Sequence, residues 1–370
     1  MKERISLWQL FLVLIIFLVG SAVVVGAGEE AKQNYWLAEL IALSIGVIIV
    51  VGYFFLLSRI PGKNIFELIE TGFGKVVGKA IVFFYIIYFI YIAGRVLRDF
   101  GELILTTILP LTPVEIIPLV MSLLLAYALY LGIEVFARMT EVLGPFILLA
   151  LFLVGVFLFI GGDLEFQLLL PVLEDGFGPV IDAVFPTMVT FPYGELIVCT
   201  ILMTQTNHFH YVPKVGVAAV IISGLLITYS NVIQIVTLGV DIKVRSSFPL
   251  LVAAREIEVF DFFERVDILV VFILMFGIMV KAGVFLYGGV KGLEHLFKLP
   301  YRAFLFPTSM LLAFFSVIIA DNIVEHYEEG LALVPYFLHL PFQFGIPIVL
   351  CLILLIKQRM SQSSAGGLEV

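Results

Sequence analysis

Charged residues are scarce in this chain, and their scarcity excludes most classes of protein. Asp, Glu, Lys and Arg make up 14% of its 370 residues, apolar residues make up 62%, and the mean hydropathy is +1.15. A soluble domain contains about 25% charged and about 45–50% apolar residues. So little charge cannot cover a soluble globule of this length, and such high hydropathy excludes a disordered chain. The composition therefore predicts a polytopic protein embedded in a lipid membrane.

Cysteine, histidine and basic charge are also in short supply. The two cysteines, Cys199 and Cys351, lie inside apolar runs, so we expect free thiols. The five histidines lie mostly in loops and lack metal-ligand spacing. The formal net charge of -8 leaves no basic surface for nucleic acid. With no phosphate-binding or dinucleotide-binding glycine motif either, we expect no catalytic residue, no enzyme activity, no cofactor, no metal and no nucleic-acid partner.

Long apolar runs fill most of the sequence. A helix needs about 20 apolar residues to cross the hydrocarbon core of a bilayer. Ten runs predict ten transmembrane helices in an all-α integral membrane protein, and they cover residues 7–28, 36–58, 80–108, 115–132, 141–161, 183–204, 215–240, 267–290, 303–321 and 334–356. We predict one transporter-like domain over 1–360, with helices one to five in about 7–161 and helices six to ten in about 183–356. A short disordered tail is predicted at 361–370.

The distribution of basic residues predicts the orientation of these spans. Ten spans place both termini on one side of the membrane. The termini and the loops on that side carry thirteen Lys or Arg residues, whereas the opposite loops carry five. Cytoplasmic loops are enriched in basic residues, so we expect both termini in the cytoplasm. One opposite loop, about 241–266, mixes Phe and Leu with Arg, Glu and Asp, which suggests an interfacial or gate-covering helix.

The ten spans divide into two halves of five, which must have opposite orientations, as in many secondary transporters. The first span of each half contains helix-weakening residues: Gly20-Ser21, Gly26 and Gly28 in span one, and two prolines and a glycine within 185–195 in span six. Such residues free backbone groups that need a neighbouring helix, a water or a ligand as a partner. A ligand site is one interpretation, and a tolerated kink in each span is the other.

A mid-membrane site between spans one and six suits a ligand with both an ammonium and a carboxylate. Half-helix N-termini offer N–H groups to the carboxylate, and freed carbonyls accept from the ammonium. Small residues let the ligand approach the backbone, and aromatic or acidic neighbours complete the site. The candidate ligand-binding residues are Gly20, Ser21, Ala22, Thr187, Thr190, Phe191, Tyr193, Gly194, Glu195 and Tyr91.

Three segments together resemble a known family. They are the first cytoplasmic loop (59–64 and 74–79), the span-six segment 191–195, and the outer loop (248–249, 254–257 and 262–267). In order and topology they resemble the GerAB-type B subunits of nutrient germinant receptors from endospore-forming bacteria, in the amino acid–polyamine–organocation transporter superfamily. Tyr193 stands where that family often has Phe, and Asp267 where it often has Glu.

The resemblance implies a LeuT-like five-plus-five inverted repeat with broken helices one and six. It also implies a subunit that senses a nutrient, commonly an amino acid such as L-alanine, and triggers germination. Its location would be the inner spore membrane or the cell membrane, and its partners the receptor A subunit and the C lipoprotein. A proton-coupled amino acid permease is the alternative function, and a structural subunit with a vestigial pocket is a third.

Lys281 and Glu195 fall inside predicted spans, where an unpaired charge is costly. In a LeuT-like architecture, Lys281 of span eight would lie near a cation site beside span one. There it could replace sodium or carry a coupling proton, and the alternative is a simple ion pair with Glu195. Glu195 itself either braces the broken helix or contacts an amino group of the ligand.

Span three carries a further group of charges near its outer end. An i,i+4 spacing pairs Arg95 with Asp99 and Arg98 with Glu102 along one stripe of a helix. We interpret this group as a salt-bridge network rather than a substrate site, with a part in a gate as the alternative.

Overall fold

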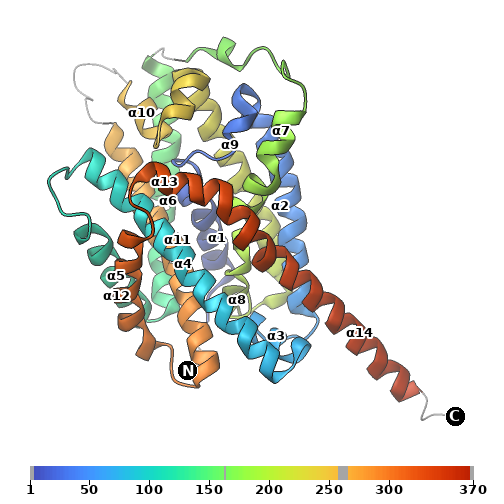
Figure 1. Ribbon diagram of the computed structural model, residues 1–370. Helices are drawn as coiled ribbons and strands as arrows, with labels where there is room; N and C mark the ends of the chain where they lie inside the picture. Colours follow the sequence, from blue (N-terminus) through green and yellow to red (C-terminus); the bar gives the residue numbers. More distant parts are fainter. Residues whose placement is uncertain (1–3, 162–163, 257–265, 367–370) are drawn as a thin grey trace.

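The computed structural model describes residues 4–161, 164–256 and 266–366 (Figure 1). Within these residues the regular structure is helical, apart from an isolated bridge between Ile5 and Thr206. Helices suit a lipid environment because they satisfy their backbone groups within one segment. With η marking 3-10 and π-helical segments, the elements are α1 (Leu7–Ala22), η1 (Glu29–Asn34), α2 (Tyr35–Ser58), α3 (Ile65–Phe73), α4 (Lys75–Thr107), α5 (Ile116–Tyr130), α6 (Ile133–Gly161), η2 (Phe166–Leu169), α7 (Gly178–Ala183), η3 (Val184–Tyr193), η4 (Gly194–Ile197), α8 (Thr200–Met203), η5 (Phe209–Tyr211), α9 (Val212–Arg245), α10 (Pro249–Arg255), α11 (Asp267–Phe297), α12 (Arg302–Ile318), α13 (Ile323–Glu328), η6 (Glu329–Leu333), η7 (Pro335–Gly345) and α14 (Ile346–Gly366).

Seven of the described helical segments are long and apolar enough to cross a membrane. An eighth span results if α12 and the α13–η6 segment, which bend by 109° at a short break, count as one. The apolar helices α1 and α5 are shorter. Each predicted apolar run thus falls on a largely helical part of the chain, and local capping explains some of the helix starts. Ser6 caps α1 together with Gln9, and Asn64 caps α3 together with Glu67.

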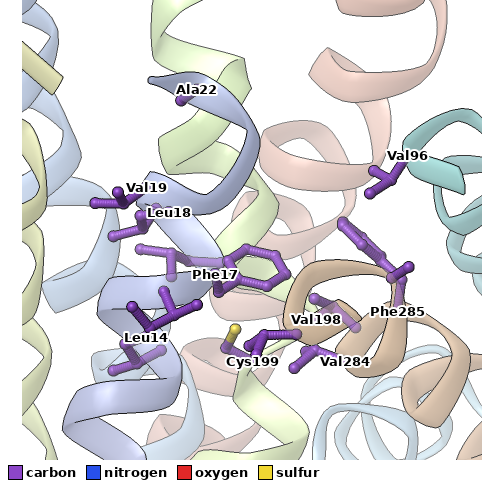
Figure 2. Packing of buried hydrophobic residues seen from close by; sticks show 14 of the residues in the cluster. Leu14, Phe17, Leu18, Val19, Ala22, Val96, Val198, Cys199, Val284 and Phe285 are labelled. Atoms are coloured by element: carbon purple, nitrogen blue, oxygen red, sulfur yellow. The ribbon is translucent and has the colours of Figure 1, made fainter. Parts of the chain in front are cut away.

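Helix α1 lies in the middle of the bundle (Figure 1), where it packs against α6, α9 and α11. At its contact with α11, a Cβ built on Gly20 would lie 2.6 Å from the Cα of Gly277, so the two backbones touch directly. Figure 2 shows the apolar core along the same two helices, where the rings of Phe17 and Phe285 are 5.4 Å apart. This packing fixes the end of α1 against α11.

The loops gather at two ends of the bundle. The termini and α3 lie at one end, and α7, α10 and α13 lie at the other (Figure 1). These two groups correspond to the two sets of loops that the sequence predicts on opposite sides of the membrane. Of the predicted interfacial helix at 241–266, the structure contains α10, whereas 257–265 lie outside the described residues. Helix α14 continues through 361–366 of the predicted tail, and 367–370 also lie outside the described residues.

Candidate functional site

Helix α1 ends inside the protein, and side chains of a neighbouring helix donate hydrogen bonds to a backbone carbonyl just after its end. The helix ends at Ala22, and the next helical segment, η1, begins at Glu29. The carbonyl of Val23 accepts hydrogen bonds from Ser230 Oγ at 3.0 Å and Gln234 Nε2 at 2.9 Å, both on α9. Side chains of α9 thus replace the helical partner that this carbonyl lacks.

The segment that contains η3 and η4 is also irregular. Phe185 and Phe191 depart from helical backbone angles, with φ of -122° and -121°. Each precedes a proline, whose ring disfavours the helical conformation of the residue before it. The hydroxyl of Tyr53 on α2 lies 2.9 Å from the carbonyl of Gly194 and 3.0 Å from the carbonyl of Gln343 on η7. This tyrosine therefore ties η4 to two other elements.

A buried ion pair joins α11 to η4. Lys281 Nζ lies 2.6 Å from Glu195 Oε2, and the two side chains are 0% and 3% exposed. Lys281 also donates a hydrogen bond to Ser21 Oγ near the end of α1, at 3.1 Å. Its ammonium lies 4.1 Å from the ring centroid of Phe191 and 5.7 Å from that of Phe17. The lysine thus connects α1, η3, η4 and α11 at one point.

A small cavity lies beside Glu195. Its volume is about 60 Å³, several times the roughly 10–15 Å³ that one buried water needs. The lining combines polar groups with an apolar wall and consists of Val25, Ile92, Arg95, Val96, Asp99, Phe191, Glu195, His326, Tyr327, Gly330, Leu331, Val334 and His339. These lining residues come from the chain after α1, from α4, from η3 and η4, and from the segment after α12.

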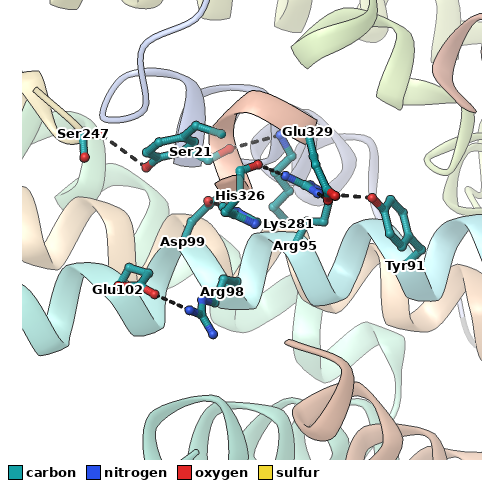
Figure 3. Close-up of polar contacts among 11 residues, drawn as sticks. Ser21, Tyr91, Arg95, Arg98, Asp99, Glu102, Ser247, Lys281, His326 and Glu329 are labelled. Atoms are coloured by element: carbon teal, nitrogen blue, oxygen red, sulfur yellow. Dashed lines mark hydrogen bonds and ion pairs between the residues drawn. The ribbon is translucent and has the colours of Figure 1, made fainter. Parts of the chain in front are cut away.

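We call residues 323–333, which form α13 and η6, the lid, because they cover this cavity. Arg95 of α4 contacts the lid through the carbonyl of His326 and through Glu329, whose Oε2 is 3.6 Å from Arg95 Nη1. His326 Nε2 in turn lies 2.8 Å from Asp99 Oδ1 (Figure 3). Arg95 Nη1 also donates to the hydroxyl of Tyr91 at 3.1 Å. Polar contacts with α4 therefore hold the lid over the cavity.

Above the lid lies a larger hollow, which we call the vestibule. Its volume is about 750 Å³, and its lining includes Glu29, Asp182, Thr187, Arg245 and Glu328. The vestibule and the cavity share three lining residues, Val25, Tyr327 and Leu331. We call these three residues, which border both spaces, the wall.

Comparisons with known proteins identify the family. The model of the family described as "Spore germination protein" matches residues 4–323. Spore germination protein KB of Bacillus subtilis (strain 168) is 35% identical over 370 residues, which cover 99% of this chain and 98% of that relative. The chain belongs to the spore germination protein family. Putative spore germination protein YfkT of the same organism is 30% identical over 297 residues, 78% of each chain.

A solved structure identifies the fold of this family member. The crystal structure of MhsT in complex with L-phenylalanine matches with a TM-score of 0.64 and 13% identity, over 96% of this chain and 99% of MhsT. That likeness shows a LeuT-like transporter fold. The long apolar helices and the family identify an integral membrane protein. The family model and the relatives confirm the family resemblance of the sequence.

The structure brings some of the predicted ligand-binding residues to the cavity. Phe191 and Glu195 line it directly, and Ser21 is linked to Glu195 through Lys281. Thr187 lines the vestibule instead, with its hydroxyl 3.3 Å from the carbonyl of Leu331 on the lid.

The other predicted residues have different surroundings. Gly20 packs against the backbone of α11, and Ala22 belongs to the apolar core. The hydroxyl of Thr190 donates to the carbonyl of Thr187, 3.0 Å away within η3. A Cβ on Gly194 would clash with Gln343, so this glycine allows close packing against η7. Tyr91 contacts Arg95, and its side chain does not line the cavity.

Tyr193 points away from the cavity, toward α2. Its hydroxyl donates to Glu39 Oε1 at 2.5 Å, and Tyr35 donates to the other carboxylate oxygen at 3.3 Å. Glu39 is 1% exposed. Sequence reasoning passes over this buried acid, although an isolated Glu inside an apolar run was a signal that could have drawn attention to it.

One of the two predicted pairs in span three is confirmed and the other is wrong. Arg98 Nη2 lies 2.6 Å from Glu102 Oε1, as the i,i+4 spacing predicts. Arg95 and Asp99 do not pair with each other. Arg95 binds Glu329 and Asp99 binds His326, because the lid supplies partners that are better placed than the next turn of α4.

Several residues of the site have no clear signal in the sequence. The lid residues His326, Tyr327 and Leu331 lie in the loop that the sequence predicts between spans nine and ten, and the bend after α12 brings them to the cavity. His339 lines the cavity, and its Nδ1 lies 2.8 Å from the hydroxyl of Tyr88.

Proposed function

We propose that this protein is the nutrient-sensing B subunit of a spore germinant receptor and that a small nutrient, an amino acid, binds in the cavity. The observation that carries the proposal is the cavity between the interrupted segments after α1 and in η3–η4, whose lining combines charged side chains with apolar ones. It offers Glu195 and Arg95 to a ligand and lies below the vestibule. Membership of the spore germination family supports the biological role, and the LeuT-like fold supports binding at this position.

The proposal includes an architecture of ten spans in two inverted halves, with helices one and six broken. The short helices α1 and α5, the bent α12–lid pair and the seven long segments together account for ten spans. Both termini and α3 would face the cytoplasm, since the basic loops lie at that end. The vestibule would then open away from the cytoplasm, in the inner spore membrane or the cell membrane. Signalling would pass to a receptor A subunit and a C lipoprotein.

Lys281 has a defined place in this proposal. Its ammonium links α1 to α11 through Ser21 and to η4 through Glu195, at contacts that a bound cation could otherwise bridge. We propose that it acts as a permanent internal cation. Ligand binding is then expected to be independent of sodium.

Equilibrium binding and counterflow with one set of purified variants test the function. The wild type in liposomes preloaded with unlabelled amino acids is given a panel of labelled amino acids. Val334→Phe adds bulk at the cavity wall, where Val334 is 5% exposed, whereas Leu333→Phe makes a similar change at a side chain that is 53% exposed. We expect saturable binding that Val334→Phe abolishes and Leu333→Phe preserves. Equal binding by both variants would refute the cavity as the site.

The same experiment separates the sensor from a proton-coupled permease, which the LeuT-like fold and the vestibule above the cavity also favour. A permease exchanges labelled for unlabelled amino acid across the membrane, and this exchange would be lost in Val334→Phe. A sensor binds the ligand without exchange. We expect binding without counterflow, since the family is one of germination proteins.

A further inference from the structure

Arg95 is a buried cation at the edge of the cavity. Its side chain is 8% exposed, and it lines the cavity from α4. The guanidinium is charged at all accessible pH values and has five N–H donors. Two of its contacts are neutral, the hydroxyl of Tyr91 and the carbonyl of His326. The positive charge of Arg95 therefore needs an acidic partner.

The acidic partner in the structure is loosely held. Among the described residues, Glu329 of the lid is the carboxylate within 4.0 Å of Arg95, at 3.6 Å. Its side chain is 38% exposed, so water can solvate it once it leaves the arginine. An ion pair of this length that is open to water on one side stabilises little. Glu329 can therefore give up Arg95 to another carboxylate at low cost.

Other acids around the cavity already have partners. Glu195 pairs with Lys281 at 2.6 Å, and Asp99 lies 2.8 Å from His326. Arg95 is thus the cation of this site whose acidic partner is both distant and exposed. The absence of a side chain at Gly330 leaves room for the guanidinium, because a Cβ there would lie 3.1 Å from Arg95 Cζ.

We propose that Arg95 recognises the ligand by its carboxylate, which takes the place of Glu329 on the guanidinium. This inference rests on the proposed function and names the group by which the nutrient is selected. A planar carboxylate matches the guanidinium fork better than the single 3.6 Å contact of Glu329 does. Arg95 is then a specificity-determining residue, and exchange of its carboxylate partner frees Glu329 of the lid from α4.

The test compares each amino acid with its amide, which lacks the negative charge. Equilibrium binding of labelled glycine, L-alanine, L-valine and L-phenylalanine, and of the four amides, is measured for wild type, Arg95→Gln and Glu329→Gln. Glu328→Gln is the matched control, since Glu328 is exposed, lies next to Glu329 and lines the vestibule. For at least one amino acid, we expect the amide to bind wild type about tenfold more weakly or worse.

The variants give the proposal two independent readouts. Arg95→Gln should lose about tenfold or more in affinity for the amino acid and little for the amide. Glu329→Gln should bind the amino acid more tightly than wild type, because the competing charge is gone, and Glu328→Gln should match wild type. If Arg95→Gln does not fold, the amide comparison and Glu329→Gln still decide the matter.

The outcomes distinguish this inference from the function on which it rests. Equal binding of amino acid and amide, or weaker binding in Glu329→Gln, overturns the role of Arg95 and leaves the nutrient site intact. Equal losses for both ligands in Arg95→Gln indicate a purely structural arginine and also overturn it. No saturable binding of any amino acid or amide by the folded wild type overturns the proposed function together with the inference.

Discussion

The ion pair between Lys281 and Glu195 makes a quantitative prediction about stability. Both side chains are at most 3% exposed, and 2.6 Å separates the charged atoms. Removal of one partner leaves an uncompensated buried charge, which costs about 3–5 kcal/mol. Lys281→Met and Glu195→Leu are each expected to destabilise the protein by this amount. The double variant should lie within about 1–2 kcal/mol of wild type, because an apolar pair replaces the ionic one without a stranded charge.

A double-mutant cycle measures this coupling through the free energy of unfolding in detergent. The matched control is the pair of Arg138 and Glu134, which has the same 2.6 Å separation but side chains that are 65% and 43% exposed. Its coupling should be about 0.5 kcal/mol or less. The reasoning fails if Lys281→Met and Glu195→Leu have additive effects, or if the exposed pair shows as much coupling as the buried one.

Three further predictions follow from contacts around α1. Gly20→Ala should destabilise the protein by about 1–3 kcal/mol, since the new methyl group meets the backbone of Gly277. The control Gly52→Ala, whose new methyl group has no atom within 4 Å, should be tolerated. Thermal unfolding compares the two variants, and equal stability would contradict the contact. Ser230→Ala combined with Gln234→Leu strands the carbonyl that follows α1, and should cost about 1–3 kcal/mol in the same assay and weaken amino acid binding. Replacement of sodium by choline should leave equilibrium binding unchanged because an internal lysine already supplies the cation, and a strong sodium requirement would disprove this role.

Local patterns in the sequence predict much of this fold. Apolar runs find the helices because burial in lipid demands apolar side chains over a whole segment. The i,i+4 spacing finds the pair of Arg98 and Glu102 because both residues lie on one helix. The pair of Lys281 and Glu195, which the sequence offers as one interpretation of the lysine, is confirmed because an isolated charge in an apolar span needs an opposite charge.

The rest depends on contacts between segments far apart in the chain. Gly20 has the sequence signature of a ligand-binding glycine, but its neighbour is Gly277, and no local pattern reveals that a second glycine approaches it. Arg95 has a suitable acid one turn away, yet binds Glu329, because the bend after α12 brings the lid over α4. Packing between segments decides which of two chemically reasonable partners a side chain meets.

In the proposed receptor, a nutrient that passes from the vestibule to the cavity would have to displace the wall of Val25, Tyr327 and Leu331, which border both spaces, and this has a consequence for the timing of a response. A ligand that must wait for a wall to open associates more slowly than diffusion allows, because its rate of entry includes the rate of opening. Once the wall closes again, the same barrier delays escape. In the proposed receptor, a brief encounter with nutrient would then pass without effect. Occupancy of the cavity would instead depend on how long the nutrient persists, so the receptor would respond to sustained rather than brief exposure.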